Sequence, residues 1–211
     1  MNSRPSVLVV AGLDPTGGAG IQADIETLND LGCQARSLVT CLTIQDSKNV
    51  VSFEPVSAHL VKQQFETLKQ DIQFDAVKIG MIGSLPMLDM VVTIIETLPD
   101  IPVILDPVLA AGGGTSLVQD NFIAHMQQKL LPLVKVATPN LPEAQALSGQ
   151  ITTEQCAKQL LKYGMEHMLI TGAHDDGKSV VNTLYSRDSE PYALQCDRLQ
   201  GEFHGSGCTF A

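Results

Sequence analysis

The chain has 211 residues, of which 44% are hydrophobic and 17% charged; this suits one well-buried α/β domain and excludes a disordered or coiled-coil protein. Its formal net charge of −10 has the wrong sign for binding a nucleic-acid backbone, so nucleic acid is not expected as a partner. No stretch approaches the roughly 20 apolar residues that a membrane span needs, and the five cysteines form no Cys-x-x-Cys pair. We therefore expect a cytoplasmic protein with reduced thiols, no membrane partner and no zinc site.

Hydrophobic periodicity predicts alternating strands and helices. The first unit is the buried-strand run "SVLVVAG", a glycine-rich turn, and a helix over residues 21–31 with apolar residues at helical spacing. Further strands are expected at residues 37–44, 75–81, 103–107, 134–139 and 167–172, with helices between them. Residues 179–186 and 191–196 then predict an antiparallel hairpin. The alternation predicts a single domain over residues 1–211, with a mostly parallel sheet covered by helices on both faces.

Polar residues and glycines collect just after the predicted strands, where open parallel sheets bind their ligands. The first such stretch, "GLDPTGGAGIQAD", contains Gly18-x-Gly20-x-x-Ala23, a loose match to the dinucleotide fingerprint. Three residues separate these glycines from the strand, and no acidic residue ends the second strand to bind a ribose, so NAD is a weak interpretation. The simpler alternative is a tight turn that lets helix and strand approach each other.

A second glycine cluster, Gly205-Ser206-Gly207-Cys208, has the composition of a loop that turns backbone N–H groups toward an anion at the start of a helix. In the first turn of that helix, the thiol pKa of Cys208 is expected to fall below its free value of about 8.5. The alternative interpretation of this cluster alone is a buried cysteine after a flexible turn.

Five motifs follow one another along the chain: "AGLDPTGGAGIQAD", "KIGM", "LDPV", "TPNLPEA" and "HGSGCT". In this order they resemble the hydroxymethylpyrimidine/phosphomethylpyrimidine kinases of thiamin synthesis, which belong to the ribokinase superfamily. The resemblance covers essentially the whole chain. It implies a ribokinase-like three-layer α/β sandwich that transfers the γ-phosphoryl group of ATP to a primary alcohol on a pyrimidine or its monophosphate, with Mg²⁺.

The resemblance also implies roles for individual residues. The anion hole is formed by Gly205, Ser206, Gly207 and Cys208, and Cys208 is expected to be catalytic, with a role as base as a hypothesis. The metal residues are Asn140 and Glu143, which match the family's Asn-x-x-Glu element, and Asp106. The nucleotide side comprises Asp106, Asn140, Thr171 and Gly172, and the pyrimidine pocket comprises Gly12, Asp24, Gln45, Met81 and Val108.

Some of these residues also have a purely structural interpretation. Asn140 is also a candidate helix N-cap, and Met81 alone would be interpreted as core packing. His174 and His204 are interpreted as loop residues rather than metal ligands.

The sequence departs from the family pattern at several points. Residues 171–174 lack the lysine that relatives carry there, and "QDSKNV" replaces a more usual Gln-Asn-Thr run, which leaves substrate preference open. Relatives continue past the Gly-Ser-Gly-Cys loop, so we expect C-terminal helices to be missing and activity to be low as given. Two alternatives stay open: a pyridoxal or pyridoxine kinase of vitamin B6 salvage, and a catalytically silent pyrimidine-binding homologue. A homodimer is expected only by analogy with the superfamily.

Overall fold

The computed structural model describes residues 4–110, 121–172, 179–201 and 204–211. Within this part of the chain the strands are β1 (Ser6–Leu13), β2 (Gln34–Gln45), β3 (Val50–Pro55), β4 (Ala76–Ile79), β5 (Val103–Leu105), β6 (Val136–Ala137), β7 (His167–Ile170), β8 (Ser179–Ser186) and β9 (Ser189–Asp197). They form one sheet in the order β3-β2-β1-β4-β5-β6-β7-β8-β9. The neighbours from β2 to β7 pair in parallel, and β3, β8 and β9 are antiparallel to their neighbours.

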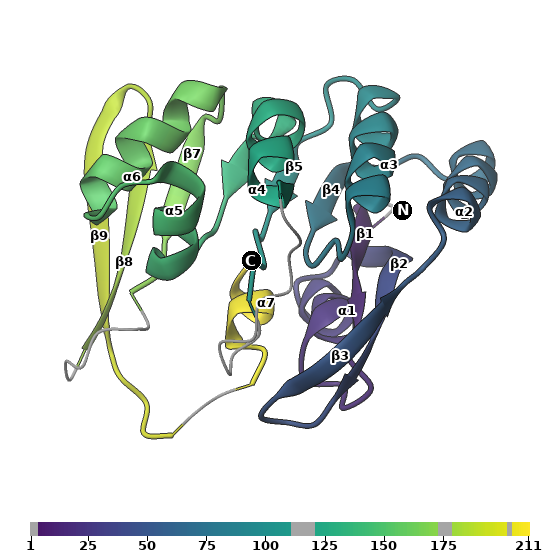
Figure 1. Ribbon diagram of the computed structural model, residues 1–211, viewed down its shortest axis with the longest axis horizontal. Helices are drawn as coiled ribbons and strands as arrows, with labels where there is room; N and C mark the ends of the chain where they lie inside the picture. Colours follow the sequence, from purple (N-terminus) through teal and green to yellow (C-terminus); the bar gives the residue numbers. More distant parts are fainter. Residues whose placement is uncertain (1–3, 111–120, 173–178, 202–203) are drawn as a thin grey trace.

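Helices cover the sheet on both sides (Figure 1). The α-helices are α1 (Gly20–Asp30), α2 (Ala58–Asp71), α3 (Leu85–Glu96), α4 (Phe122–His125), α5 (Leu141–Ser148), α6 (Thr153–Leu160) and α7 (Ser206–Phe210). A π-helical segment η1 (Met126–Leu130) and a 3-10 segment η2 (Leu131–Leu133) continue α4, and a 3-10 segment η3 (Leu161–Tyr163) follows α6.

The alternation of side chains along β1 divides the core into two layers. Leu8 and Val10 face a large apolar cluster that includes buried side chains from α2 to α6, whereas Val7, Val9 and Ala11 face a smaller cluster with Ile21 of α1. Both faces of β1 are therefore covered, which explains why its sequence is a continuous apolar run. The expected layered α/β fold with a mostly parallel sheet is confirmed.

The strand order places a topological switch point between β1 and β4. The chain moves from β1 to β2 on one side and later returns to add β4 on the other, so the connections leave in opposite directions. Ligands of open α/β sheets bind at such a crevice, outside the carboxyl ends of the strands. The first glycine loop, residues 14–19, begins at this point.

The predicted hairpin near the C-terminus is confirmed as β8 and β9. Strand β3 was not predicted: its residues are mostly exposed and pair only with the distal part of β2, so they lack the buried apolar run used to recognise the other strands. Among the described residues, no helix is both long and apolar enough to cross a membrane.

Candidate active site

One buried carboxylate organises the first glycine loop. Asp14 is 2% exposed and accepts hydrogen bonds from the backbone N–H and the hydroxyl of Thr16, both at 2.8 Å, and from the N–H of Ala19 at 2.9 Å. Gly20 follows with a φ of 58°, and a Cβ there would overlap the carbonyl oxygen of Gly12. The loop therefore needs glycine both for its backbone conformation and for close approach to β1.

The second glycine cluster packs directly on the first. Gly205, with a φ of 75°, is the N-cap of α7, and a Cβ on it would overlap the carbonyl oxygen of Gly18. Helix α7 lies beside α1 (Figure 1). His204 Nε2 lies 2.8 Å from Asp14 Oδ2, so the side chain interpreted as a plain loop residue joins the two clusters.

A buried charged cluster lies next to these loops. Lys78, on β4, has a side chain only 7% exposed, and its Nζ lies 2.5 Å from Asp24 Oδ1 on α1 and 4.0 Å from Asp106 Oδ2 after β5. Both aspartates were expected site residues, whereas Lys78, although part of the motif "KIGM", was given no role. The available signal was a lysine inside the buried-strand pattern "AVKIG", since lysine is rarely buried without a partner.

The cluster has more negative than positive groups. Burial lowers the pKa of Lys78, but the charges of Asp24 and Asp106 outweigh burial and raise it, so the lysine is an ammonium. Burial raises the pKa of Asp106, as does Asp24, while Lys78 and a hydrogen bond with Cys208 oppose the rise. Oδ2 of Asp24 and Oδ2 of Asp106 are buried and have no hydrogen-bond partner among the described residues. Such groups are costly unless a ligand contacts them.

Cys208 completes the cluster from α7. Burial and the charge of Asp106 raise its thiol pKa to about 12, against the opposing effects of Lys78 and a hydrogen bond with the Gly20 backbone. The expectation of a lowered pKa was wrong: α7 has five residues, and its positive end is outweighed by burial and a neighbouring carboxylate. At neutral pH this side chain is a thiol.

The expected pyrimidine-pocket residues come from neighbouring strand ends. A Cβ on Gly12 would lie 3.5 Å from Met81 Sδ, which places these two residues against each other, and Asp24 lies in the charged cluster. Gln45, at the end of β2, lies close enough to Asp14 to lower the pKa of its carboxyl. Val108 lies just beyond Asp106 and donates its N–H to the Asp106 carbonyl at 2.9 Å.

Asn140 and Glu143 form a capping box at the start of α5. Asn140 Oδ1 accepts from the Glu143 N–H at 2.9 Å, and Glu143 Oε2 accepts from the Asn140 N–H at 3.0 Å. Burial raises the pKa of Glu143 to about 7, with a further contribution from Asp106 and opposition from the N–H groups of Asn140 and Leu109. The N-cap alternative for Asn140 is therefore correct, and the box lies within electrostatic reach of Asp106.

Thr171 and Gly172 follow β7 beside this box. The Thr171 N–H donates to the Pro139 carbonyl at 3.0 Å, and the Gly172 N–H donates to Asn182 Oδ1 at 3.2 Å. A Cβ on Gly172 would overlap the carbonyl oxygen of Val181, so packing against β8 is sufficient reason for glycine at this position. His174 lies outside the described residues.

Residues 172–179, "GAHDDGKS", match the letters of the P-loop pattern, so a P-loop is not excluded by the letters of the sequence. A P-loop joins a strand to a helix whose first N–H groups hold the phosphates. Here the match follows β7 and ends at Ser179, the first residue of the antiparallel strand β8. Its residues 173–178 lie outside the described part of the chain. The flanking elements therefore do not provide the context of a P-loop.

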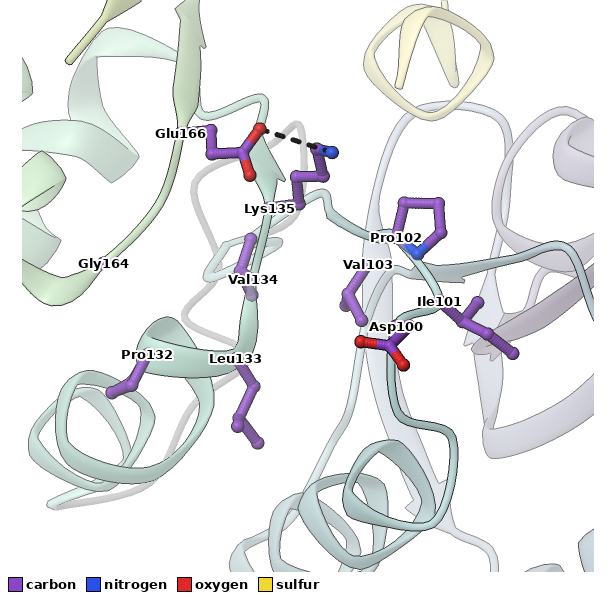
Figure 2. Close-up of a pocket in the computed structure, with 10 residues that line it drawn as sticks. All are labelled: Asp100, Ile101, Pro102, Val103, Pro132, Leu133, Val134, Lys135, Gly164 and Glu166. Carbon is purple, nitrogen blue, oxygen red and sulfur yellow. Dashed lines mark ion pairs between the residues drawn. The ribbon is translucent and has the colours of Figure 1, made fainter. Parts of the chain in front are cut away.

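A separate pocket of about 310 Å³ lies at the opposite end of the strands (Figure 2). It is lined by residues that precede β5, β6 and β7, and its charged pair, Lys135 and Glu166, is joined at 3.3 Å with both side chains about half exposed. Ligands of parallel sheets bind outside the carboxyl ends, and the buried charges of this molecule lie there too. We therefore assign the candidate site to the glycine loops.

Comparison with known proteins agrees with the fold and the motifs. Solved structures similar to this chain include a phosphomethylpyrimidine kinase from Clostridium difficile, with a TM-score of 0.82 and 28% identity over 98% of this chain and 87% of that one. They also include a pyridoxal kinase from Staphylococcus aureus in complex with AMP-PCP and pyridoxal, with a TM-score of 0.87 and 29% identity over 100% of this chain and 78% of that one. The fold is thus that of the ribokinase-like kinases.

Sequence comparison gives the family. The family model for phosphomethylpyrimidine kinase matches residues 14–211. The hydroxymethylpyrimidine/phosphomethylpyrimidine kinase of Haemophilus influenzae is 36% identical over 220 residues, covering 100% of this chain and 82% of the relative. The chain belongs to the phosphomethylpyrimidine kinase family.

Proposed function

We propose that this protein transfers the γ-phosphoryl group of ATP to 4-amino-5-hydroxymethyl-2-methylpyrimidine, to its monophosphate, or to both. One observation carries the proposal: a continuous chain of contacts links the glycine-cysteine loop to the expected pyrimidine pocket. Cys208 and Asp106 are close enough to shift each other's pKa, and Lys78 pairs with both Asp106 and Asp24. The groups expected at the phosphoryl end and at the alcohol end of the reaction are therefore neighbours, as in-line transfer requires.

The anion hole is assigned to the start of α7. The first N–H groups of a helix have no intrahelical acceptor, so those of Ser206, Gly207 and Cys208 are available for phosphoryl oxygens as charge develops in the transition state. Because burial and Asp106 raise the pKa of Cys208 to about 12, we assign its catalytic role to the backbone N–H and not to a thiolate base.

The nucleotide is assigned to the loops after β6 and β7, where Asn140, Thr171 and Gly172 lie. The AMP-PCP bound to the pyridoxal kinase relative supports ATP as the phosphoryl donor. A Mg²⁺ ion would supply charge neutralisation between the phosphates. Asp106, whose buried Oδ2 accepts no hydrogen bond from the described residues, and the nearby Glu143 are suitable oxygen donors for a hard cation.

The protein alone offers few direct metal ligands. The described residues contain no group of three or more His, Cys, Asp or Glu side chains placed to hold an ion, and the capping box occupies Asn140 and Glu143. This donor set fits an ion that arrives with the nucleotide and keeps most of its water. We place the reaction in the cytoplasm, in keeping with the five free cysteines.

Pyridoxal is the second candidate substrate, because a pyridoxal kinase shares 29% identity and a TM-score of 0.87 with this chain. The decisive experiment measures ADP release with Mg·ATP and hydroxymethylpyrimidine, its monophosphate or pyridoxal. Turnover of either pyrimidine supports the proposal, whereas turnover of pyridoxal alone assigns the protein to vitamin B6 salvage. If the protein binds the pyrimidine and releases no ADP with any of the three, a silent binding homologue becomes the correct interpretation.

A further inference from the structure

The buried lysine of β4 has a specific place between the expected substrate residue and the phosphoryl end. Its Nζ is 2.5 Å from Asp24 Oδ1, which occupies one oxygen of that carboxylate, and 4.0 Å from Asp106 Oδ2. The second oxygen of Asp24 is buried and has no hydrogen-bond partner among the described residues. One oxygen of Asp24 is therefore paired with Lys78, whereas the other is buried without a hydrogen bond from the described residues.

Stability alone does not explain this arrangement. The free-energy cost of desolvating two charges is often larger than the attraction between them in a buried ion pair. Here a single ammonium faces two carboxylates. Unpartnered buried oxygens add to the cost. A ligand that brings N–H donors would satisfy the open oxygen of Asp24, and an aminopyrimidine has such donors on its amino group.

We propose that Lys78 is a positioning residue for the alcohol substrate: its ammonium fixes the carboxylate of Asp24 so that Oδ2 accepts a hydrogen bond from an amino-substituted heterocycle. This inference rests on the proposed function and extends it to Lys78, which lies in the motif "KIGM" but was given no role from the sequence. The role belongs to substrate binding, so its loss raises KM for the alcohol more than KM for Mg·ATP.

A double-mutant cycle tests whether Lys78 acts through Asp24. The four proteins are the wild type, Lys78→Met, Asp24→Asn and the double variant, each assayed for KM of hydroxymethylpyrimidine, KM of Mg·ATP and thermal midpoint. Lys135→Met is the matched control, because its partner Glu166 is half exposed and lies at the other end of the strands. The control is expected to keep wild-type kinetics.

Loss of a hydrogen bond to a charged group predicts that Lys78→Met raises the pyrimidine KM about tenfold, with the Mg·ATP value changed less than about threefold. Asp24→Asn should have a similar effect, and the double variant should be no worse than the more damaged single variant. If the two single-variant increases in pyrimidine KM multiply in the double variant, Lys78 does not act through Asp24 and the proposal is overturned. An unchanged pyrimidine KM in Lys78→Met would also overturn it.

Folding failure does not obscure the result. Removing one partner of a buried pair is more damaging than removing both, so if Lys78→Met does not fold, Asp24→Asn and the double variant are compared instead. Failure of both Met variants to fold would assign Lys78 to the fold itself and overturn the proposal. If the wild type phosphorylates no alcohol, the proposed function fails separately, and the cycle is measured by calorimetric binding of hydroxymethylpyrimidine, which needs no turnover.

Discussion

His204 Nε2 lies 2.8 Å from Asp14 Oδ2, a contact that spans 190 positions of sequence. Burial raises the pKa of Asp14, but hydrogen bonds from the Thr16 backbone, Gln45 and His204 outweigh it and lower the value to about 2. The carboxylate is therefore ionised at neutral pH and only accepts, so the imidazole Nε2 carries the donated proton. Asp14 thus holds the two glycine clusters and the end of β2 in one arrangement.

Asp14→Asn should lower the free energy of unfolding by about 2 kcal/mol at pH 7, because an amide cannot accept every bond that the carboxylate accepts. A folded pKa of about 2 lies below the ordinary 3.8, so this stabilisation is present above pH 4 and disappears as the pH falls through 2. Urea unfolding at pH 7 and at pH 3 checks both statements. Asp89→Asn, which breaks an exposed pair with Lys129, is the control and should change stability by less than about 1 kcal/mol.

Gly205→Ala should destabilise the C-terminal loop and abolish most activity. Its φ of 75° disfavours alanine, and the new Cβ would overlap the Gly18 carbonyl of the first glycine cluster. Gly207→Ala is the steric control, because no atom lies within 4 Å of a Cβ placed there. Thermal unfolding should show a lower midpoint for Gly205→Ala and an unchanged or slightly higher one for Gly207→Ala; equal midpoints would contradict the packing of the two loops.

Glu143→Gln should remove a pH dependence of stability. The folded pKa of about 7 lies above the ordinary 4.5, so the protonated side chain contributes stability that is complete below pH 4.5 and is lost as the pH rises through 7. Glutamine keeps the capping box. Between pH 4.5 and pH 8 the free energy of unfolding of the wild type should therefore fall by about 3 kcal/mol relative to that of this variant. Urea unfolding across that range measures the difference. Glu154→Gln, at an exposed position in the first turn of α6, should parallel the wild type.

Cys208→Ser should retain turnover within about tenfold, because a thiol with a pKa of about 12 is not the base at neutral pH and serine keeps the backbone N–H. The measurement is kcat from pH 6 to pH 9 for both proteins. The two profiles should have the same shape. A rise of kcat with pH that is present in the wild type and missing from the serine variant would instead assign the proton transfer to the thiolate.

Elements that depend on a local sequence pattern were predicted correctly. The apolar run of β1, the hairpin of β8 and β9, and the capping residue Asn140 were all predicted, because strand burial, turn chemistry and helix capping depend on residues near one another in sequence. Strand β3 was missed, because an exposed edge strand lacks a buried apolar pattern. The letters of residues 172–179 match the P-loop pattern but precede strand β8 instead of a helix, which shows that a motif needs its structural context.

By itself, the sequence determined the layered α/β class, the kinase family resemblance and the set of loops at which a ligand would bind. Only the tertiary structure decided how those loops act on one another. It placed Gly205 against Gly18, paired Lys78 with Asp24, and reversed the expected pKa shift of the half-buried Cys208 through desolvation and the charge of Asp106. The physical reason is that burial and charge act through distances in space, and the sheet brings together strand ends that are far apart in the chain.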